Sequence, residues 1–263
     1  MTTVALCSAK GSPGATTTAQ LTANSWPAGR RLLVVEADPA GGDLAARLGL
    51  HADPGMVSLA SEGRRGLTAS VVDAHAQAVG DEVVVLLGPA GGRAATAAVT
   101  VLADRLVEAM TATTDRDVLM DCGRMSAGSP AWPLARSADT VAIVVGSTAA
   151  DVAHTASLVE DLIAADANVG LVVVGEAHAG GDRYPAPDIS EALGCPILAT
   201  LPHEPRVAGA LALGRYTGRA LSRSRLARAA ADLSGRLTAP TESPSPAPRP
   251  IEVRDLPTLE PMS

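Results

Sequence analysis

The segment Lys10-Gly11-Ser12-Pro13-Gly14-Ala15-Thr16-Thr17-Thr18 follows an apolar run, Thr3–Ser8, and leads into a helical pattern over Thr16–Ser25. A glycine-rich turn between a strand and a helix presents backbone N–H groups and the positive end of the helix dipole to an anion. Glycine lets the backbone approach phosphate oxygens, and the hydroxyl of Thr16 is placed to bind Mg²⁺. The segment therefore predicts a phosphate-binding loop.

Apolar runs alternate with helical patterns along the rest of the chain. The runs are rich in Val, Leu and Ile with little alternation, as in strands that are covered on both faces. This predicts an α/β fold of the P-loop NTPase kind, a mostly parallel sheet of about seven strands with helices on both faces. The expected strands are Thr3–Ser8, Arg31–Glu36, Glu82–Leu87, Asp117–Asp121, Thr140–Val145, Val169–Val174 and Pro196–Thr200. The expected helices are Thr16–Ser25, Asp43–Leu48, Arg93–Thr113, Ala150–Ala165, Ala186–Leu193, Arg206–Leu213 and Arg219–Leu237.

Two of these strands end in acidic residues. The second expected strand ends at Glu36, and Asp38 follows with the spacing that points both side chains the same way. The fourth expected strand ends at Asp121, which is the form of a Walker B motif. Ligands bind at the carboxyl ends of the strands in such sheets, so these acids are expected beside the loop.

Together the motifs resemble those of the MinD/ParA family of P-loop ATPases, from residue 3 to about residue 237. Lys10 to Thr17 is similar to that family's deviant Walker A motif, K-G-G-x-G-K-T-T. The resemblance implies catalytic roles for two residues: Lys10 would reach the partner's nucleotide across a dimer interface, and Asp38 would position the attacking water. More narrowly, the S-P-G-x-T-T loop and the D-C-G-R after the fourth strand resemble the MinD-like proteins of high-GC actinobacteria.

The same resemblance implies ATP or ADP with Mg²⁺ as cofactors. Thr16, Asp38 and Asp121 would serve the metal, and the segment Leu201–Pro205 looks like the family's loop beside the adenine. The nucleotide-binding residues would then be Gly11, Ser12, Pro13, Gly14, Ala15, Thr16, Thr17, Pro202 and Glu204.

Three features depart from the family pattern. Ala15 stands where the family has the lysine that neutralises the β- and γ-phosphates, and Pro13 removes one backbone N–H from the loop. The asparagine that recognises adenine is absent, because Val174 is followed by Gly175 and Glu176. Weak or absent hydrolysis is expected, and base selectivity stays open. Lys10 is the only lysine among the 21 basic residues, which supports a specific role for it.

The sequence leaves three functional hypotheses. The first is a nucleotide-promoted homodimer, a switch that positions a cargo such as a chromosome, a division complex or a pilus or secretion machine. The second is a pseudo-ATPase scaffold that acts through protein partners without using nucleotide. The third is a partition protein that binds DNA non-specifically through arginines near the last helix. For these arginines we favour the alternative interpretation, in which they form a solvated helix face. The arginines concerned are Arg215, Arg219, Arg223, Arg225 and Arg228.

Composition sets the remaining limits. A net charge of −7 over 263 residues argues against a surface that binds nucleic acid throughout. The three cysteines are far apart, which favours buried thiols over a zinc site or a disulfide. We expect a P-loop domain over residues 1–237 and a disordered, proline-rich tail over residues 238–263 that could bind a partner. Without a signal peptide or an amphipathic basic end, we expect a cytoplasmic protein that does not bind membranes directly.

Overall fold

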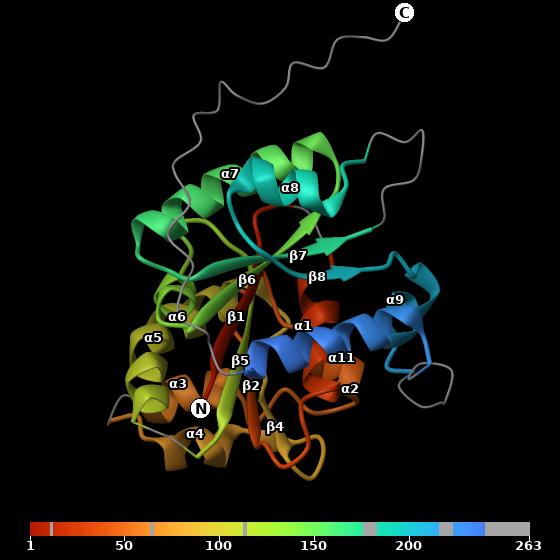
Figure 1. Ribbon diagram of the computed structural model, residues 1–263. Coiled ribbons are helices and arrows are strands. Elements are labelled where there is room, and N and C mark those ends of the chain that lie inside the picture. The colour runs from red at the N-terminus through yellow and green to blue at the C-terminus, as the bar shows by residue number, and fades with distance from the viewer. Residues whose placement is uncertain (11–12, 64–65, 113–114, 176–182, 216–222, 240–263) are drawn as a thin grey trace, which may run out of the picture.

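The computed structural model describes residues 1–10, 13–63, 66–112, 115–175, 183–215 and 223–239. Within these residues the strands form one sheet in the order β3-β4-β2-β5-β1-β6-β7-β8 (Figure 1). The strands are β1 (Thr3–Ser8), β2 (Leu32–Glu36), β3 (Gln77–Ala78), β4 (Val83–Leu86), β5 (Asp117–Arg124), β6 (Thr140–Gly146), β7 (Val169–Val174) and β8 (Ile197–Leu201). The helices are α1 (Ala15–Asn24), α2 (Leu44–Leu48), α3 (Met56–Glu62), α4 (Ala69–His75), α5 (Gly92–Thr111), α6 (Trp132–Arg136), α7 (Ala149–Ala164), α8 (Ala186–Leu193), α9 (Pro205–Ala212) and α11 (Arg225–Thr238).

Every pair of neighbouring strands is parallel except β3 and β4, which are antiparallel. The predicted α/β fold with a mostly parallel sheet is therefore confirmed. The sheet has one strand more than expected, because the two-residue strand β3 at its edge is too short to leave a hydrophobic pattern.

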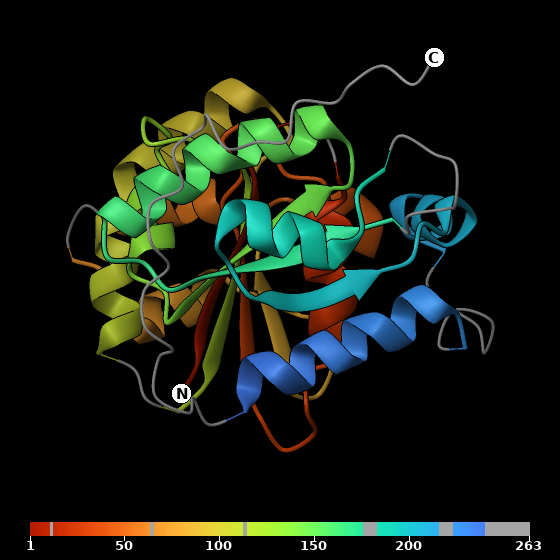
Figure 2. The ribbon, with the colours of Figure 1, turned by 45° about the horizontal axis from the view of Figure 1, so that its top comes forward.

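Helices cover both faces of the sheet (Figures 1 and 2). Buried residues of α3 to α8 form one apolar cluster, and buried residues of α1, α2, α9 and α11 form the other. Successive residues of β1 alternate between the two, since Ala5 and Cys7 face the first cluster while Val4 and Leu6 face the second. The two-sided burial explains why these strands read as continuous apolar runs.

The sheet order gathers the predicted motifs at one edge. β1 lies between β5 and β6, and β2 lies on the other side of β5. All three strands β1, β2 and β5 run parallel, so their carboxyl ends meet at the same edge. Glu36 and Asp121 are register partners there, and α1 is the next element after β1, beyond the predicted loop.

Several elements differ from the expectations. Helices α3, α4 and α6, of five to seven residues, were not predicted. The last helix begins at Arg225 and not near Arg219, because the hydroxyl of Ser224 caps it by accepting a hydrogen bond from the amide of Ala227 at 3.0 Å. Residues 219–222 and 240–263 of the predicted helix and tail lie outside the described residues.

The structure also bears on the cysteines and on membrane-spanning helices. Cys7, Cys122 and Cys195 are buried free thiols, as predicted. None of the helices within the described residues has both the length and the apolar character needed to cross a bilayer.

Candidate functional site

The predicted phosphate-binding loop leads into an open helix N-terminus. Gly14 is the N-cap of α1 and has a left-handed backbone, with φ of 102°, a conformation that glycine adopts without strain. No side chain of the described residues caps the helix, and its first backbone hydrogen bond runs from the amide of Thr18 to the carbonyl of Gly14. The amides of the first turn are therefore suited to an anion. Gly11 and Ser12 lie outside the described residues.

Ala15 begins α1 and is buried, with 8% of its surface exposed. Its methyl group belongs to the apolar cluster beneath the helix. The residue therefore offers only its backbone N–H to a ligand.

Asp121 is the most deeply buried acid of the site, with 0% exposed. Its Oδ1 accepts a hydrogen bond from the amide of Gly123 at 3.2 Å, while Oδ2 has no partner among the described residues. Burial raises the pKa of this carboxyl to about 6, and the nearby side chain of Thr16 acts in the opposite direction. A buried carboxylate oxygen without a donor is costly, so it marks a place for a ligand.

Asp38 lies above the end of β5, two residues after β2. Its Oδ1 accepts a hydrogen bond from the amide of Ala40 at 2.8 Å, and burial raises the pKa of the carboxyl above its usual value. Gly123 is left-handed with φ of 59°, and a Cβ there would collide with the carboxyl group of Asp38. Position 123 therefore has to be glycine for Asp38 to occupy this place.

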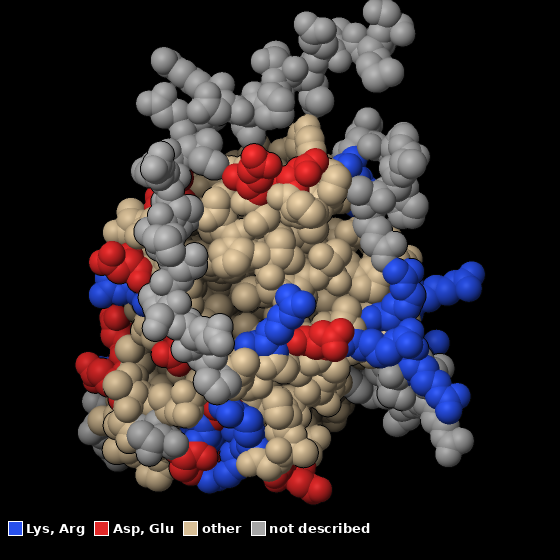
Figure 3. Space-filling view, in the orientation of Figure 1, with Lys and Arg blue, Asp and Glu red and all other residues tan. Residues whose placement is uncertain are grey.

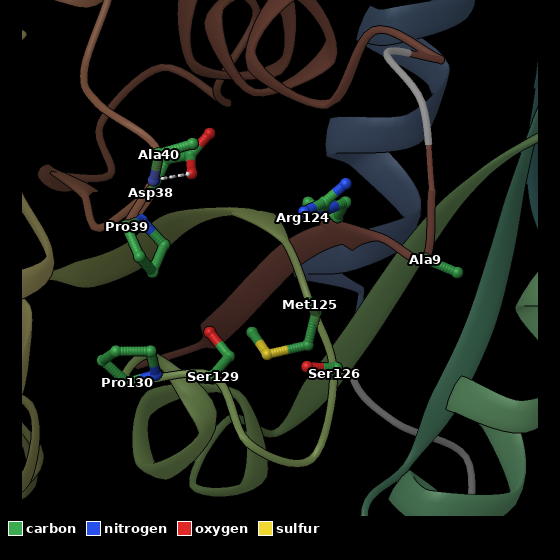
Figure 4. A pocket seen from close by; sticks show the side chains of 9 residues that line it. All are labelled: Ala9, Asp38, Pro39, Ala40, Arg124, Met125, Ser126, Ser129 and Pro130. Atoms are coloured by element: carbon green, nitrogen blue, oxygen red, sulfur yellow. Dashed lines mark hydrogen bonds between the residues drawn. The ribbon is translucent and has the colours of Figure 1, made fainter. Parts of the chain in front are cut away.

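A cavity of about 470 Å³ opens beside Asp38 (Figure 4). Arg124 lines it together with Asp38, and the positive charge of Arg124 lowers the pKa of that carboxyl. Ala9, the last residue before Lys10, lines the same cavity. The cavity thus joins the residue after β1, the acid after β2 and the cation at the end of β5.

Glu36 has a role that sequence reasoning missed. Its carboxylate is 2% exposed and accepts three backbone hydrogen bonds, from Asp43 at 2.6 Å, Leu44 at 2.7 Å and Gly88 at 2.9 Å. Burial nevertheless raises the pKa of Glu36 to about 7. Glu36 therefore holds the segment after β2 and the segment after β4 together instead of facing a ligand.

A second cavity, of about 320 Å³, opens beside the start of α1. It brings together the predicted residues Pro13, Gly14, Thr17, Pro202 and Glu204. One oxygen of Glu204 is already engaged, because it accepts a hydrogen bond from the amide of Leu226 at 2.9 Å and so fixes the start of α11.

Sequence reasoning also missed a cation in this cavity. Arg183 lines it and donates a hydrogen bond to the hydroxyl of Ser147 at 3.2 Å. The link between positions 147 and 183 depends on the pairing of β6 with β7, which no local motif reveals.

Lys10 has a partner within its own chain. Its Nζ lies 2.8 Å from Nε2 of His154 on α7, and the contact is exposed. Residues so far apart in sequence meet because β1 and β6 are neighbours in the sheet.

The donor set fits a hydrated Mg²⁺ ion beside a phosphate. Within the described residues no group of three or more His, Cys, Asp or Glu could hold a metal by itself. Mg²⁺ commonly takes one or two protein oxygens and completes its shell with water and phosphate. The hydroxyl of Thr16 is such an oxygen, and the unpartnered oxygen of Asp121 can accept a hydrogen bond from a water of the shell. Asp38, the third residue predicted to serve the metal, lies near enough to raise the pKa of Asp121.

No protein-family model matches the sequence, and no curated protein matches it either. Solved structures do match. A ParA family ATPase from Chlorobium tepidum has a TM-score of 0.73 and 17% identity, over 89% of this chain and 98% of that one. The cell division ATPase MinD of Pyrococcus furiosus has a TM-score of 0.72 and 21% identity, over 90% and 98%.

The septum site-determining protein MinD of Pyrococcus horikoshii, complexed with Mg-ADP, has a TM-score of 0.73 and 19% identity, over 90% of this chain and 96% of that one. These proteins agree with the chain over nearly their whole lengths in strand and helix arrangement, although few residues are identical. The chain therefore has the α/β P-loop fold of the MinD and ParA ATPases.

Proposed function

We propose that this chain is a nucleotide-dependent dimerisation switch that positions a cellular cargo, and that it binds ATP with Mg²⁺ while hydrolysing it weakly or not at all. The observation that carries the proposal is the unpartnered oxygen of Asp121, buried beside the open N-terminus of α1. A carboxylate and a set of free amides at one point favour a phosphate together with a divalent cation.

Each part of the nucleotide has candidate residues. The amides of the first turn of α1 would bind phosphate oxygens, and the cavity between Thr17 and Pro202 would take the nucleoside. Thr16 and Asp121 would hold the hydrated Mg²⁺. When bound, the ion neutralises phosphate charge. The Pyrococcus horikoshii MinD, whose fold is similar, was solved with Mg-ADP, which supports this choice of cofactor.

Weak hydrolysis follows from Ala15. Phosphoryl transfer relies on fixed positive charge around the transferred group, and loss of one such donor typically slows a reaction about a hundred- to a thousandfold. The methyl group of Ala15 is buried and supplies no charge. Asp38 would still position a water, so we propose slow turnover at most.

The dimerisation part of the proposal rests on Lys10. Lys10 is exposed and its amine is held by His154 alone among the described residues, an exposed contact that is easily exchanged. Cargo binding is supported by similarity of fold alone: MinD of Aquifex aeolicus, at 18% identity and a TM-score of 0.72, was solved in a complex with the cell division protein MinC.

The first experiment is a calorimetric titration of the full chain with ATP, with and without Mg²⁺. We expect saturable binding at micromolar concentrations that depends on Mg²⁺. Absence of binding up to millimolar ATP would reject the switch and leave the pseudo-ATPase scaffold, which acts through protein partners.

If ATP binds, sedimentation with and without nucleotide tests the dimer. We expect ATP to promote dimerisation of the wild type but not of Lys10→Ala. His154→Ala is the matched control, because it removes the intrachain partner and keeps the lysine. Equal dimerisation of Lys10→Ala and the wild type would remove Lys10 from the interface.

Binding to DNA is a second candidate, favoured by one surface. Basic side chains gather over α9 and the start of α11, at the right of Figure 3. The exposed arginines there include Arg206, Arg215, Arg223, Arg225 and Arg228, while Arg219 lies outside the described residues. Phosphate contacts by such a surface are non-specific and weaken steeply with salt.

The DNA hypothesis predicts that neutralising Arg215, Arg223 and Arg228 together abolishes salt-sensitive binding of duplex DNA. Arg136→Ala, an exposed arginine on α6, is the matched control and should leave binding unchanged. Unchanged binding by the triple variant would assign these arginines to a solvated helix face.

A further inference from the structure

Arg47 of α2 turns inward, toward the phosphate-binding helix. Its Nη1 donates a hydrogen bond to the hydroxyl of Thr17 on α1 at 3.1 Å. Its Nη2 lies 3.2 Å from the carboxylate of Asp43, one turn earlier. The side chain is only 12% exposed, although a surface arginine normally extends into water. A guanidinium is thus held against the first turn of α1.

Among the described residues, no buried carboxylate forms an ion pair with Arg47. Asp43 is its ion-pair partner, but that side chain is 67% exposed, and exposed pairs one helical turn apart are weak. Thr17 is an uncharged acceptor. Within the described residues these two contacts are the hydrogen bonds of Arg47, and a guanidinium carries more donors than they use.

The field of Arg47 reaches the centre of the site. Its positive charge lowers the pKa of Asp121, the carboxyl with the unpartnered oxygen. The guanidinium therefore contacts the helix turn suited to phosphate and acts electrostatically on the acid suited to Mg²⁺. A P-loop usually has its lysine in this neighbourhood, and here position 15 is an alanine.

We propose that Arg47 supplies, from α2, the positive charge to the nucleotide phosphates that the loop itself lacks at Ala15. This rests on the proposed nucleotide binding and adds a residue to it. Guanidinium is well suited to the task, because its planar fork binds two phosphate oxygens at once and does not lose its proton.

The placement has a structural consequence. Asp38 and Arg47 lie on one short segment between β2 and α3, which Glu36 anchors at Asp43 and Leu44. The cation of the site would then belong to the same segment as the acid that positions water, and not to the loop. A purely structural role is the competing interpretation, in which Arg47 only ties α2 to α1.

Calorimetric titration of the full chain with ADP and Mg²⁺ distinguishes the proposed charge role of Arg47 from the purely structural role. We expect Arg47→Ala to weaken binding about 10- to 100-fold, the typical effect of losing a charge-assisted contact to phosphate. Arg47→Lys keeps a charge and should lose about threefold to tenfold. Arg105→Ala is the matched control. Arg105 is a half-buried arginine on α5, away from the site, and it donates a hydrogen bond to the carbonyl of Gly63.

A rescue variant distinguishes charge from tethering. In Ala15→Lys/Arg47→Ala the cation returns to the loop, and we expect affinity to recover to within about threefold of the wild type. A tether would not be restored by that substitution. If Arg47→Ala does not fold, as judged by its melting transition, the Arg47→Lys comparison carries the test, since a mere tether would leave ADP affinity unchanged.

The titration distinguishes a failure of the role proposed for Arg47 from a failure of the proposed function. If the wild type binds ADP with Mg²⁺ and Arg47→Ala binds equally well, the role of Arg47 is wrong and nucleotide binding stands. If the wild type does not bind at all, the proposed function is wrong and the role of Arg47 fails with it.

Discussion

Glu36 and Asp121 are two buried carboxyls at the ends of neighbouring parallel strands, and they are register partners in the sheet. Burial raises the pKa of both, to about 7 for Glu36 and to about 6 for Asp121. They differ in their hydrogen bonds. Glu36 accepts from three backbone amides, whereas Asp121 accepts from Gly123 and keeps Oδ2 unpartnered.

The difference separates an acid with a structural role from the one that we propose to serve a ligand. Burial and a raised pKa are common to both residues, so neither property identifies a functional site. The unmet hydrogen-bonding capacity of Asp121 beside the open start of α1 distinguishes it from Glu36, because a buried oxygen without a donor lowers stability unless a ligand supplies one. The three predictions below test this distinction, in order of decreasing effect.

Glu36→Ala should have the largest effect. It leaves three backbone N–H groups without their acceptor and loosens the segments after β2 and β4, so we expect a loss of about 4 kcal/mol in the free energy of unfolding. Urea denaturation measures it. Glu82→Ala is the control, because that exposed acid accepts one backbone hydrogen bond, from Gly29, and should cost less than about 1 kcal/mol. Similar losses in the two variants would show that Glu36 does not anchor the segments.

The pH dependence of stability should be the next largest effect. A carboxyl whose pKa is raised in the folded state stays protonated there at pH values at which it already ionises in the unfolded state. The free energy of unfolding is therefore highest below the pKa of the unfolded state, and it falls as the pH rises through the pKa of the folded state. For Glu36 the window runs from 4.5 to about 7, and the shift corresponds to about 3 kcal/mol. Asp121 adds a window from 3.8 to about 6.

Urea denaturation between pH 4 and pH 8 checks this dependence. The free energy of unfolding of the wild type should fall across the range, and Glu36→Gln, which cannot ionise, should flatten the part above about pH 5. A wild-type profile that rises over this range would contradict the shifts.

Asp121→Asn should have the smallest effect on stability and the clearest effect on binding. Removing a buried charge should not lower the free energy of unfolding at pH 7. It should weaken the Mg²⁺-dependent part of ATP binding about 10- to 100-fold, as losing an outer-sphere partner of a metal typically does. Calorimetry with and without Mg²⁺ measures it, and unchanged Mg²⁺ dependence would make Asp121 a structural residue like Glu36.

Most of the fold could be predicted from the sequence, because strands buried on both faces leave continuous apolar runs. The runs at Thr3–Ser8 and Val169–Val174 match β1 and β7 residue for residue. Helices α3, α4 and α6 left too little pattern in five to seven residues. The start of α11 could have been found, since Ser224 is a favoured N-cap residue.

The site was predictable only as far as strand ends could be located. The sequence placed Asp38 and Asp121 near the loop, but it also predicted that Glu36 lies beside the loop and points the same way as Asp38. Their difference depends on amides at positions 43, 44 and 88, which approach Glu36 only in the folded chain. The contacts of Lys10 with His154 and of Arg47 with Thr17 likewise join elements that are distant in sequence.

Helix α11 is fastened to α1 and to the loop after β8. The hydroxyl of Ser234 donates to the carbonyl of Ser25 at the end of α1, and Glu204 holds the amide of Leu226. The exposed side of α11 is therefore linked to α1, the helix that we propose to bind phosphate. A fluorescent dye attached at position 231, which is exposed, would act as a reporter whose emission changes when the loop fills, without altering any residue of the proposed sites.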